Sequence, residues 1–156
     1  MKKIFALVII LLGILLGIVV ARNYLNGGNS LFPSSQTATI NDHKFKLDVA
    51  STDIEKENGL SNKTDLPADQ GMLFIFDKPD YYSFWMKNMK FPIDIIFIRD
   101  GTVVTIYNDV APPAPSEQNP LIYQPKSPAD MVLEINAGLS SKYGFKEGDK
   151  IKLGNI

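Results

Sequence analysis

The pattern of hydrophobic and polar positions divides the chain into one unbroken apolar segment and a longer part in which the two types alternate. Residues 4–21 carry no charge and follow Lys2 and Lys3. At a rise of 1.5 Å per residue this segment would form a helix of roughly 27 Å, enough to cross the hydrocarbon layer of a membrane. The pattern therefore predicts one N-terminal transmembrane helix within residues 1–22, either an uncleaved anchor or a signal segment.

The charges beside this segment predict its orientation. The two lysines at its start favour a cytoplasmic N-terminus, which places everything after Arg22 outside the cytoplasm. If the N-terminus is cleaved, the remaining protein is secreted. Residues 23–35 are rich in Gly, Ser and Asn, a composition typical of a flexible linker. We therefore expect a single-pass membrane protein with a tethered outer domain at residues 36–154.

Within the outer domain, short alternating segments predict β-strands. Within the segment 43–50, residues 44–49 alternate between polar and apolar, as expected for a strand with one buried face. Thr52 and Glu55 form a capping-box pattern that predicts a short helix ending at Gly59. One further helical turn is expected at 140–143. The predicted strands are 37–40, 43–50, 72–76, 82–86, 95–98, 102–107, 131–136 and 150–153.

These elements predict an all-β domain, a mainly antiparallel barrel or sandwich with one or two short helices. No predicted helix is long enough for the crossovers of a doubly wound parallel sheet. A long loop with four prolines is expected at 108–120. The segment Asp109–Tyr123 would form either a lid over a site or, because its prolines stiffen it, a fixed surface ridge.

Composition excludes several kinds of chemistry. The chain has no Cys and one His, His43, which rules out a disulfide framework, a cysteine nucleophile and a zinc site built on several Cys or His. No Gly-x-Ser-x-Gly sequence or phosphate-binding glycine loop occurs, and the acidic residues lack the spacing of a calcium loop. We therefore expect no cofactor, no metal and no catalytic residues of these types.

The charge balance bears on partners. After Arg22 the chain has 13 basic and 17 acidic residues, a net charge of −4. Nucleic acids and anionic membrane surfaces attract basic proteins, so neither is an expected partner. The sequence leaves the oligomeric state open.

Polar residues inside apolar segments are the candidates for a site. Lys87, Asn88 and Asp94 interrupt one such segment, and Glu134 and Asn136 lie in the apolar strand 131–136. In one interpretation, Glu134 and Asn136 face water, while Lys87 and Asp94 form a buried pair. In another, the five residues converge beside Trp85 and bind a small polar ligand such as a sugar or an amino-acid-like molecule. Asp94 and Glu134 could also form a general acid/base pair, as in glycoside hydrolysis.

A series of motifs resembles a known family. In order, they are Gly59-Leu60, Leu66-Pro67, Gly71-Met-Leu-Phe74, Phe84-Trp-Met-Lys-Asn88, Pro92-Ile-Asp-Ile-Ile-Phe-Ile98, Val132-Leu-Glu-Ile-Asn-Ala-Gly138 and Gly148-Asp149. They resemble the bacterial and archaeal family called domain of unknown function 192, over about residues 36–154. The resemblance implies a small all-β domain, often behind a signal or anchor.

The resemblance also implies candidate site residues. The family's recurrent polar positions correspond to Lys87, Asn88, Asp94, Glu134 and Asn136, beside Trp85. Two positions depart from the family pattern. Asn58 stands where the family usually has a basic residue before its Gly-Leu pair, and Lys63 stands where an Arg is commoner.

The leading hypothesis is a membrane-anchored, non-catalytic binding module for a small polar or carbohydrate-like ligand or an envelope component. Trp85 would stack on the ligand, Lys87 and Asn88 would donate hydrogen bonds, and Asp94 and Glu134 would accept them. One alternative is a hydrolase of cell-wall glycans with Glu134 as acid and Asp94 as base or nucleophile. Another is a structural or assembly protein of the cell envelope.

Overall fold

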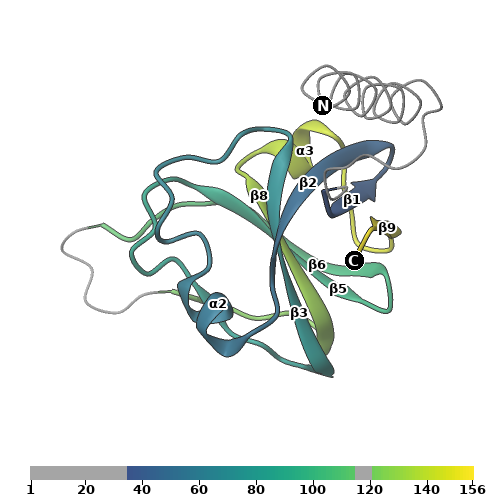
Figure 1. The fold of residues 1–156 in the computed structure, drawn as a ribbon, viewed down its shortest axis with the longest axis horizontal. Helices are drawn as coiled ribbons and strands as arrows, with labels where there is room; N and C mark the ends of the chain where they lie inside the picture. Colours follow the sequence, from purple (N-terminus) through teal and green to yellow (C-terminus); the bar gives the residue numbers. More distant parts are fainter. Residues whose placement is uncertain (1–34, 115–120) are drawn as a thin grey trace, which may run out of the picture. The chain divides into compact units, whose positions relative to one another are not determined.

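A curled sheet of seven strands organises the part of the chain described by the structure, a computed structural model that covers residues 35–114 and 121–156. The strand order is β6-β5-β8-β3-β2-β1-β9, and β4 and β7 form a separate two-stranded sheet. Figure 1 shows the curl of the large sheet. The elements in chain order are β1 (Thr37–Ile40), β2 (His43–Ala50), α2 (Asp53–Asn58), β3 (Gln70–Asp80), β4 (Phe84–Trp85), β5 (Ile93–Arg99), β6 (Thr102–Val110), β7 (Ile122–Tyr123), β8 (Ala129–Asn136), α3 (Leu139–Lys142) and β9 (Ile151–Gly154).

The two edges of this sheet meet at one end. Thr102 at the start of β6 forms an antiparallel bridge with Lys150, just before β9. The backbone N–H of Val103 donates to the carbonyl of Asp149 at 2.9 Å, and that of Gly148 donates to the carbonyl of Val103 at 2.8 Å. The sheet is therefore a half-barrel that closes between β6 and β9, which confirms the predicted mostly β architecture.

Local sequence signals account for the turns and the first described helix. Asn41 and Asp42 connect β1 to β2 with positive φ angles of 45° and 66°, a conformation that Asn and Asp tolerate best among non-glycine residues. Thr52 caps α2 as predicted: its hydroxyl accepts from the Glu55 N–H at 3.3 Å, and the Glu55 carboxylate accepts from the Thr52 N–H at 2.9 Å.

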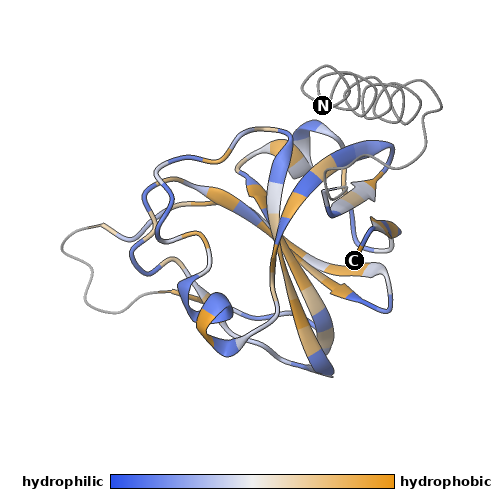
Figure 2. Cartoon of the chain, viewed as in Figure 1, coloured by the Kyte–Doolittle hydropathy of each residue, from blue (hydrophilic) through white to orange (hydrophobic). Residues whose placement is uncertain are grey.

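The sheet separates two hydrophobic clusters, one on each face. The inner cluster fills the half-barrel and includes Leu73, Ile96 and Leu133. The outer cluster lies between the sheet and the segments that cover it, 51–69 and 81–92, and includes Phe74 and Val132. Hydrophobic residues predominate on β3 and β5, whereas β2 and α2 carry many hydrophilic ones (Figure 2). Both faces of the central strands are therefore buried.

Three features differ from the sequence-based prediction. β2 and β3 pair in parallel, because the segment 51–69 crosses the outer face with only the short helix α2. β6 extends to Val110, so the first part of the predicted loop 108–120 is a strand. Residues 122–123 form β7, which pairs with β4. The pairings of β2 with β3 and of β4 with β7 join strands that are separated in sequence by other elements, which local propensity does not indicate. The end of β6 pairs with the start of β5, at the open end of their hairpin.

The described residues include no helix that is both long and apolar enough to cross a membrane. The predicted transmembrane segment, 4–21, and residues 23–34 of the predicted linker lie outside the described residues.

Candidate ligand-binding site

A pocket of about 250 Å³ lies on the outer face of the sheet, between α2, β3 and the segment 82–89. It is lined by one buried acid, by aromatic rings and by charged residues from the covering segments. The lining residues are Lys56, Glu57, Asn58, Gly59, Leu60, Ser61, Phe74, Phe76, Tyr82, Ser83, Phe84, Trp85, Lys87, Met89 and Glu134.

The aromatic wall of the pocket is built by contacts between rings. Phe76 and Tyr82 stack with their centroids 3.6 Å apart, and Phe74 meets Phe84 edge to face at 5.0 Å. The Tyr82 hydroxyl donates to the carbonyl of Lys78 at 2.7 Å. Desolvation raises the pKa of Tyr82, and the nearby Asp80 and Asp77 add to the effect. These contacts hold the rings in place independently of any ligand.

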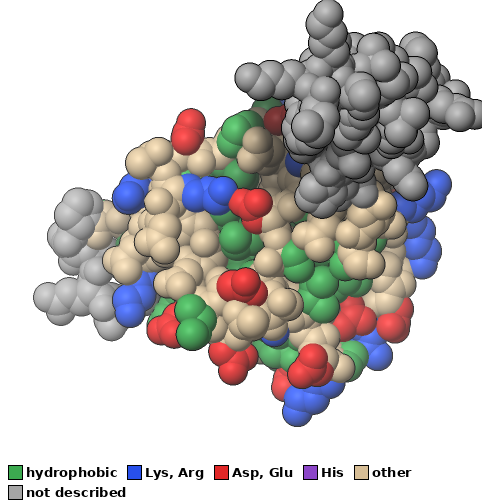
Figure 3. Space-filling model, in the orientation of Figure 1, with side chains coloured by type: hydrophobic (Ala, Val, Ile, Leu, Met, Phe, Trp, Pro, Cys, Tyr) green, Lys and Arg blue, Asp and Glu red, His purple; other side chains and the backbone are tan. Residues whose placement is uncertain are grey.

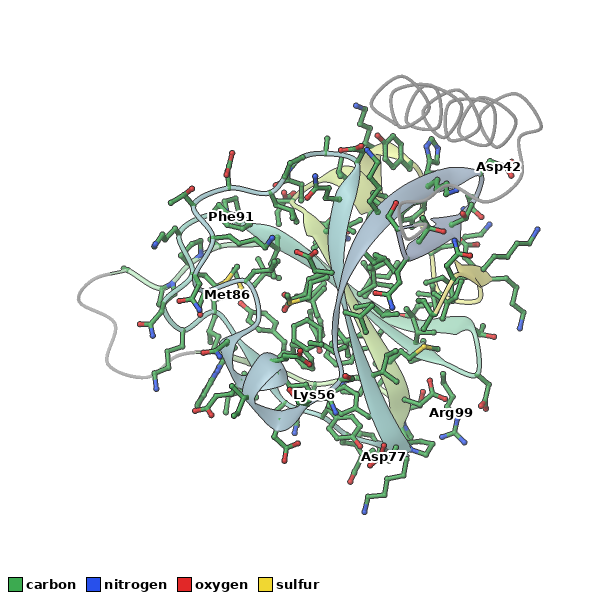
Figure 4. All side chains as sticks on the ribbon, in the orientation of Figure 1. Asp42, Lys56, Asp77, Met86, Phe91 and Arg99 are labelled. Carbon is green, nitrogen blue, oxygen red and sulfur yellow. The ribbon has the colours of Figure 1, made fainter. Side chains whose placement is uncertain are left out.

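Two lysines stand at the pocket, each over an aromatic face. The Lys56 ammonium lies 4.8 Å from the centre of the Phe76 ring, and the Lys87 ammonium lies 5.3 Å from that of Trp85. Figure 4 shows Lys56 between α2 and β3. Neither lysine forms an ion pair with a described carboxylate. Trp85 is 52% exposed, so its ring also offers a face to solvent.

Glu134 is the buried acid of the pocket. It lies on β8 opposite Met72 of β3 and Ile95 of β5, and it is only 6% exposed. Its carboxyl group makes no hydrogen bond or ion pair with any described residue. Burial therefore raises the pKa of Glu134 to about 8, since nothing compensates the lost hydration of the charged form. At neutral pH this group is mainly a protonated acid with an unused donor.

A glycine allows the strands to approach at this position. A Cβ atom on Gly71 would lie 2.8 Å from the backbone oxygen of Glu134 and 3.1 Å from the Ile135 side chain. No other residue fits there without moving the backbone of β8. The Gly71-Met-Leu-Phe74 motif thus fixes the depth at which Glu134 lies beneath the pocket.

Asp94 lies on the other face of the sheet. It pairs in register with Ile135 of the inner cluster, whereas Glu134 pairs with Ile95 of the outer cluster. The Asp94 carboxylate is fully buried and accepts three backbone N–H bonds, from Asp109 and Gly138 at 2.9 Å and from Ser140 at 2.7 Å. It thereby ties β6 and the start of α3 to β5. Asp94 does not line the pocket.

Two predictions about Asp94 are therefore wrong. Asp94 forms no ion pair with Lys87, because Lys87 lies at the pocket on the outer side while Asp94 is turned inward. Asp94 and Glu134 also do not form an acid/base pair, since the sheet lies between them. Asp94 and Glu134 therefore cannot flank one glycosidic bond, as the predicted glycan hydrolase requires of its two carboxyl groups.

The two amide candidates have local structural roles. Asn88 adopts a positive φ of 61° in the turn closed by the bond from the Met89 N–H to the carbonyl of Met86, and it does not line the pocket. The Asn136 side chain donates to the carbonyl of Leu66 and so holds the covering segment 51–69 against the sheet. The interpretation in which Glu134 and Asn136 face water is wrong for Glu134, and Asn136 is half-buried.

Several residues of the pocket were not predicted from the sequence. Four lining residues were not among the candidates from the sequence: Lys56, Phe74, Phe76 and Tyr82. A partial signal was present at Asn58, whose departure from the family pattern was noted and which does line the pocket. Lys63, the second departure, pairs instead with Asp48 at 2.7 Å. The described part of the proline-containing loop contributes no lining residue.

Charged side chains of both signs are interspersed on the face shown in Figure 3. Among the described residues, no group of three or more His, Asp or Glu side chains is placed to hold a metal ion. The pocket lining offers hydrogen bonding by Glu134 and by the polar side chains of Asn58, Ser61 and Ser83, together with apolar contact with the rings and attraction by the two lysines.

Comparison with known proteins shows the family to which the chain belongs. The family model of domain of unknown function 192 (DUF192), described as "Uncharacterized ACR", matches residues 36–153. The chain belongs to this family. A crystal structure of a protein of unknown function from Novosphingobium aromaticivorans is similar to this DUF192 domain, with 36% identity and a TM-score of 0.66, covering 74% of this chain and 83% of that one.

A second crystal structure resembles the DUF192 domain over a longer stretch. It is a protein from Sinorhizobium meliloti described as a "putative transcription regulator", with 27% identity and a TM-score of 0.70. The match covers 82% of this chain and all of the other. No curated protein matches the sequence.

Proposed function

We propose that this DUF192 domain is a non-catalytic binding module whose small polar ligand occupies the pocket above Glu134. The observation that carries the proposal is the buried carboxyl group of Glu134, which has no partner among the described residues. The Glu134 oxygens are not among the fully buried atoms that lack a partner, so they stay accessible from the pocket. Desolvation still disfavours the charged form, and a ligand that bonds to Glu134 would replace part of the lost hydration.

The surroundings of Glu134 favour binding over a purely structural role. The aromatic rings provide apolar contact area, and the half-exposed Trp85 ring can stack on a flat or sugar-like molecule. Lys56 and Lys87 supply charge at the same pocket. By contrast, Asp94 accepts from three backbone donors and does not line the pocket, so we assign it to the fold.

The proposal includes a location. We propose that residues 4–21 anchor the domain in the cell membrane and that the pocket lies outside the cytoplasm, on the basis of the apolar segment and the two preceding lysines. A reporter enzyme that is active only outside the cytoplasm, fused after Ile156, should then be active. Inactivity of this fusion in cells that express it would contradict the location.

We also propose that nucleic acid is not the ligand. The net charge of −4 after Arg22 and the interspersed charges on the visible face do not form the basic stripe that phosphate backbones require (Figure 3). The words "putative transcription regulator" describe the Sinorhizobium meliloti protein and do not bear on this chain.

Binding can be tested by NMR on the full-length protein in mild detergent. Sugars, amino acids and small organic acids would be added in turn while the backbone amide signals are followed. The proposal predicts that at least one class shifts the amides of Gly59, Phe84 and Glu134 saturably, and that those of Lys44 and Lys152 stay in place. Shifts confined to other regions, or no response to any class, would contradict it.

A further inference from the structure

The charged groups of the pocket are unevenly distributed, and their positions indicate the chemical class of the ligand. Basic groups stand at its covering segments, on α2 and after β4, and the carboxyl group of Glu134 stands on the sheet beneath. We propose that the ligand is a small organic acid whose carboxylate is held by Lys56 and Lys87 and whose hydroxyl or carbonyl oxygen is hydrogen-bonded to Glu134. This inference rests on the proposed function and specifies the chemistry of the same site.

The size of the pocket sets the scale of the ligand. A volume of about 250 Å³ corresponds to roughly eight water molecules at their share of liquid volume. A small metabolite fits this space, while a peptide or an oligosaccharide would leave most of its atoms outside. The ligand must therefore be recognised by a few groups placed close together.

The lysines favour a negative group on the outer side of the ligand. Both ammonium groups are kept over aromatic faces, and neither is neutralised by a described carboxylate. Glu57 is the other charged lining residue on the covering segments, and it is exposed to solvent. Asp77 and Asp80 also lie near enough to Tyr82 of the pocket to raise its pKa, but neither pairs with a lysine of the pocket. The two ammonium groups are therefore the pocket groups that can attract an anion directly.

The surroundings of Glu134, at the floor of the pocket, favour an uncharged oxygen on the part of the ligand that faces the sheet. The strand neighbours of Glu134 are Met72 and Ile95, which carry no charge, and the titratable groups that share its pocket are Lys56, Glu57, Tyr82 and Lys87. With its pKa raised to about 8 by burial, Glu134 is mainly protonated at neutral pH and can donate to a hydroxyl or carbonyl oxygen. An ammonium group would instead require Glu134 to lose its proton and would itself be desolvated.

Three probes of similar length separate these chemistries. γ-Hydroxybutyrate, butyrate and γ-aminobutyrate share the carboxylate and differ in having a hydroxyl, a methyl hydrogen or an ammonium at the far end. Their affinities would be measured by NMR titration of the full-length protein at about pH 6.5 and about pH 9, on either side of the raised pKa. The hydroxy acid should bind about ten-fold more tightly than the other two at the lower pH.

The same titration yields a pH signature. Ionisation of Glu134 should weaken binding of γ-hydroxybutyrate about ten-fold between the two pH values. Glu134→Gln keeps a donor and does not titrate, so its affinity should change little over that range; this variant also corrects for any change at the lysines. Lys56→Met and Lys87→Met should each weaken binding several-fold, while Lys152→Met, on the exposed side of β9, should not.

Every other outcome overturns the inference. Tightest binding of γ-aminobutyrate, strengthening as the pH rises, would show that Glu134 pairs with a cation. If butyrate binds as tightly as γ-hydroxybutyrate, the assigned contact between the hydroxyl and Glu134 is wrong. If Lys56→Met and Lys152→Met weaken binding equally, the assigned contact between the carboxylate and Lys56 is wrong. If a sugar or amino acid shifts the pocket amides but none of the three acids does, the inference fails and the proposed function stands. If nothing binds in the pocket, both fail.

Discussion

Asp94 lies directly opposite Ile135, the residue next to Glu134, yet the two carboxyl groups are on opposite faces of the sheet. Asp94 accepts three backbone hydrogen bonds inside the half-barrel, and Glu134 makes none beneath the pocket. The carboxyl group of Asp94 is therefore bonded within the fold, and that of Glu134 is available to a ligand. Substitutions at the two positions should have opposite effects.

Asp94→Asn should destabilise the protein strongly. The amide NH₂ would face backbone donors that now bond to carboxylate oxygens, and each lost bond to a charged acceptor is worth about 1.5–3 kcal/mol. We expect a loss of about 3 kcal/mol or more in the free energy of unfolding, measured by urea denaturation. Asp48→Asn, which breaks the exposed pair with Lys63, is the control and should cost less than about 1 kcal/mol. Equal effects of the two substitutions would contradict the assignment.

Glu134→Gln should change how stability depends on pH. Burial raises the pKa of Glu134 to about 8 in the native state, above the value of 4.5 for an ordinary glutamate. Between these two values the native state keeps a proton that the unfolded chain has lost. The stability of the wild type should then fall as the pH rises, by roughly 1.4 kcal/mol per unit from about pH 5 to pH 8 through this group. Glu134→Gln should lack this contribution and be the more stable protein at pH 8.

The control for this comparison is Glu57→Gln, at an exposed carboxylate of the same pocket. Its stability curve should run parallel to that of the wild type across the range. Thermal unfolding of the three proteins at several pH values provides the measurement. A Glu134→Gln curve parallel to the wild type would mean that Glu134 ionises normally in the folded protein.

Asn88 should matter for the turn and not for binding. Its φ of 61° lies in the left-handed region, so Asn88→Gly should stay within about 0.5 kcal/mol of the wild type. Asn88→Val should cost about 1–2 kcal/mol, because a β-branched residue is strained there. Neither variant should alter the affinity for a pocket ligand; a large loss of affinity in Asn88→Gly would restore Asn88 as a binding residue.

Local elements could be predicted because their signals are local. The capping box of Thr52 and Glu55, the turn at Asn41 and Asp42, and the alternation in β2 each depend on neighbours within a few residues, and each is confirmed. The parallel pairing of β2 with β3 could not be predicted in this way. It depends on the path of the segment 51–69 across the outer face.

The site was predicted only in part for the same physical reason. Alternation correctly put Val132, Glu134 and Asn136 on one face of β8, but it could not show that this face is covered. The sequence predicts that Glu134 meets residues close to Trp85 in the chain, such as Lys87 and Asn88. Lys56 and the aromatic wall come from α2 and β3, and tertiary packing alone brings them to the pocket.

Glu134 is an unpaired acid at the floor of the pocket, and with its pKa raised to about 8 it is mainly neutral at physiological pH. Its side-chain carboxyl ¹³C signal, assigned by comparison with Glu134→Gln, can be followed from pH 4 to pH 10 in the ligand-free protein. We predict a single titration with a pKa of about 8. A pKa near the ordinary glutamate value of about 4.3 would show a solvated or paired carboxylate and would contradict the account.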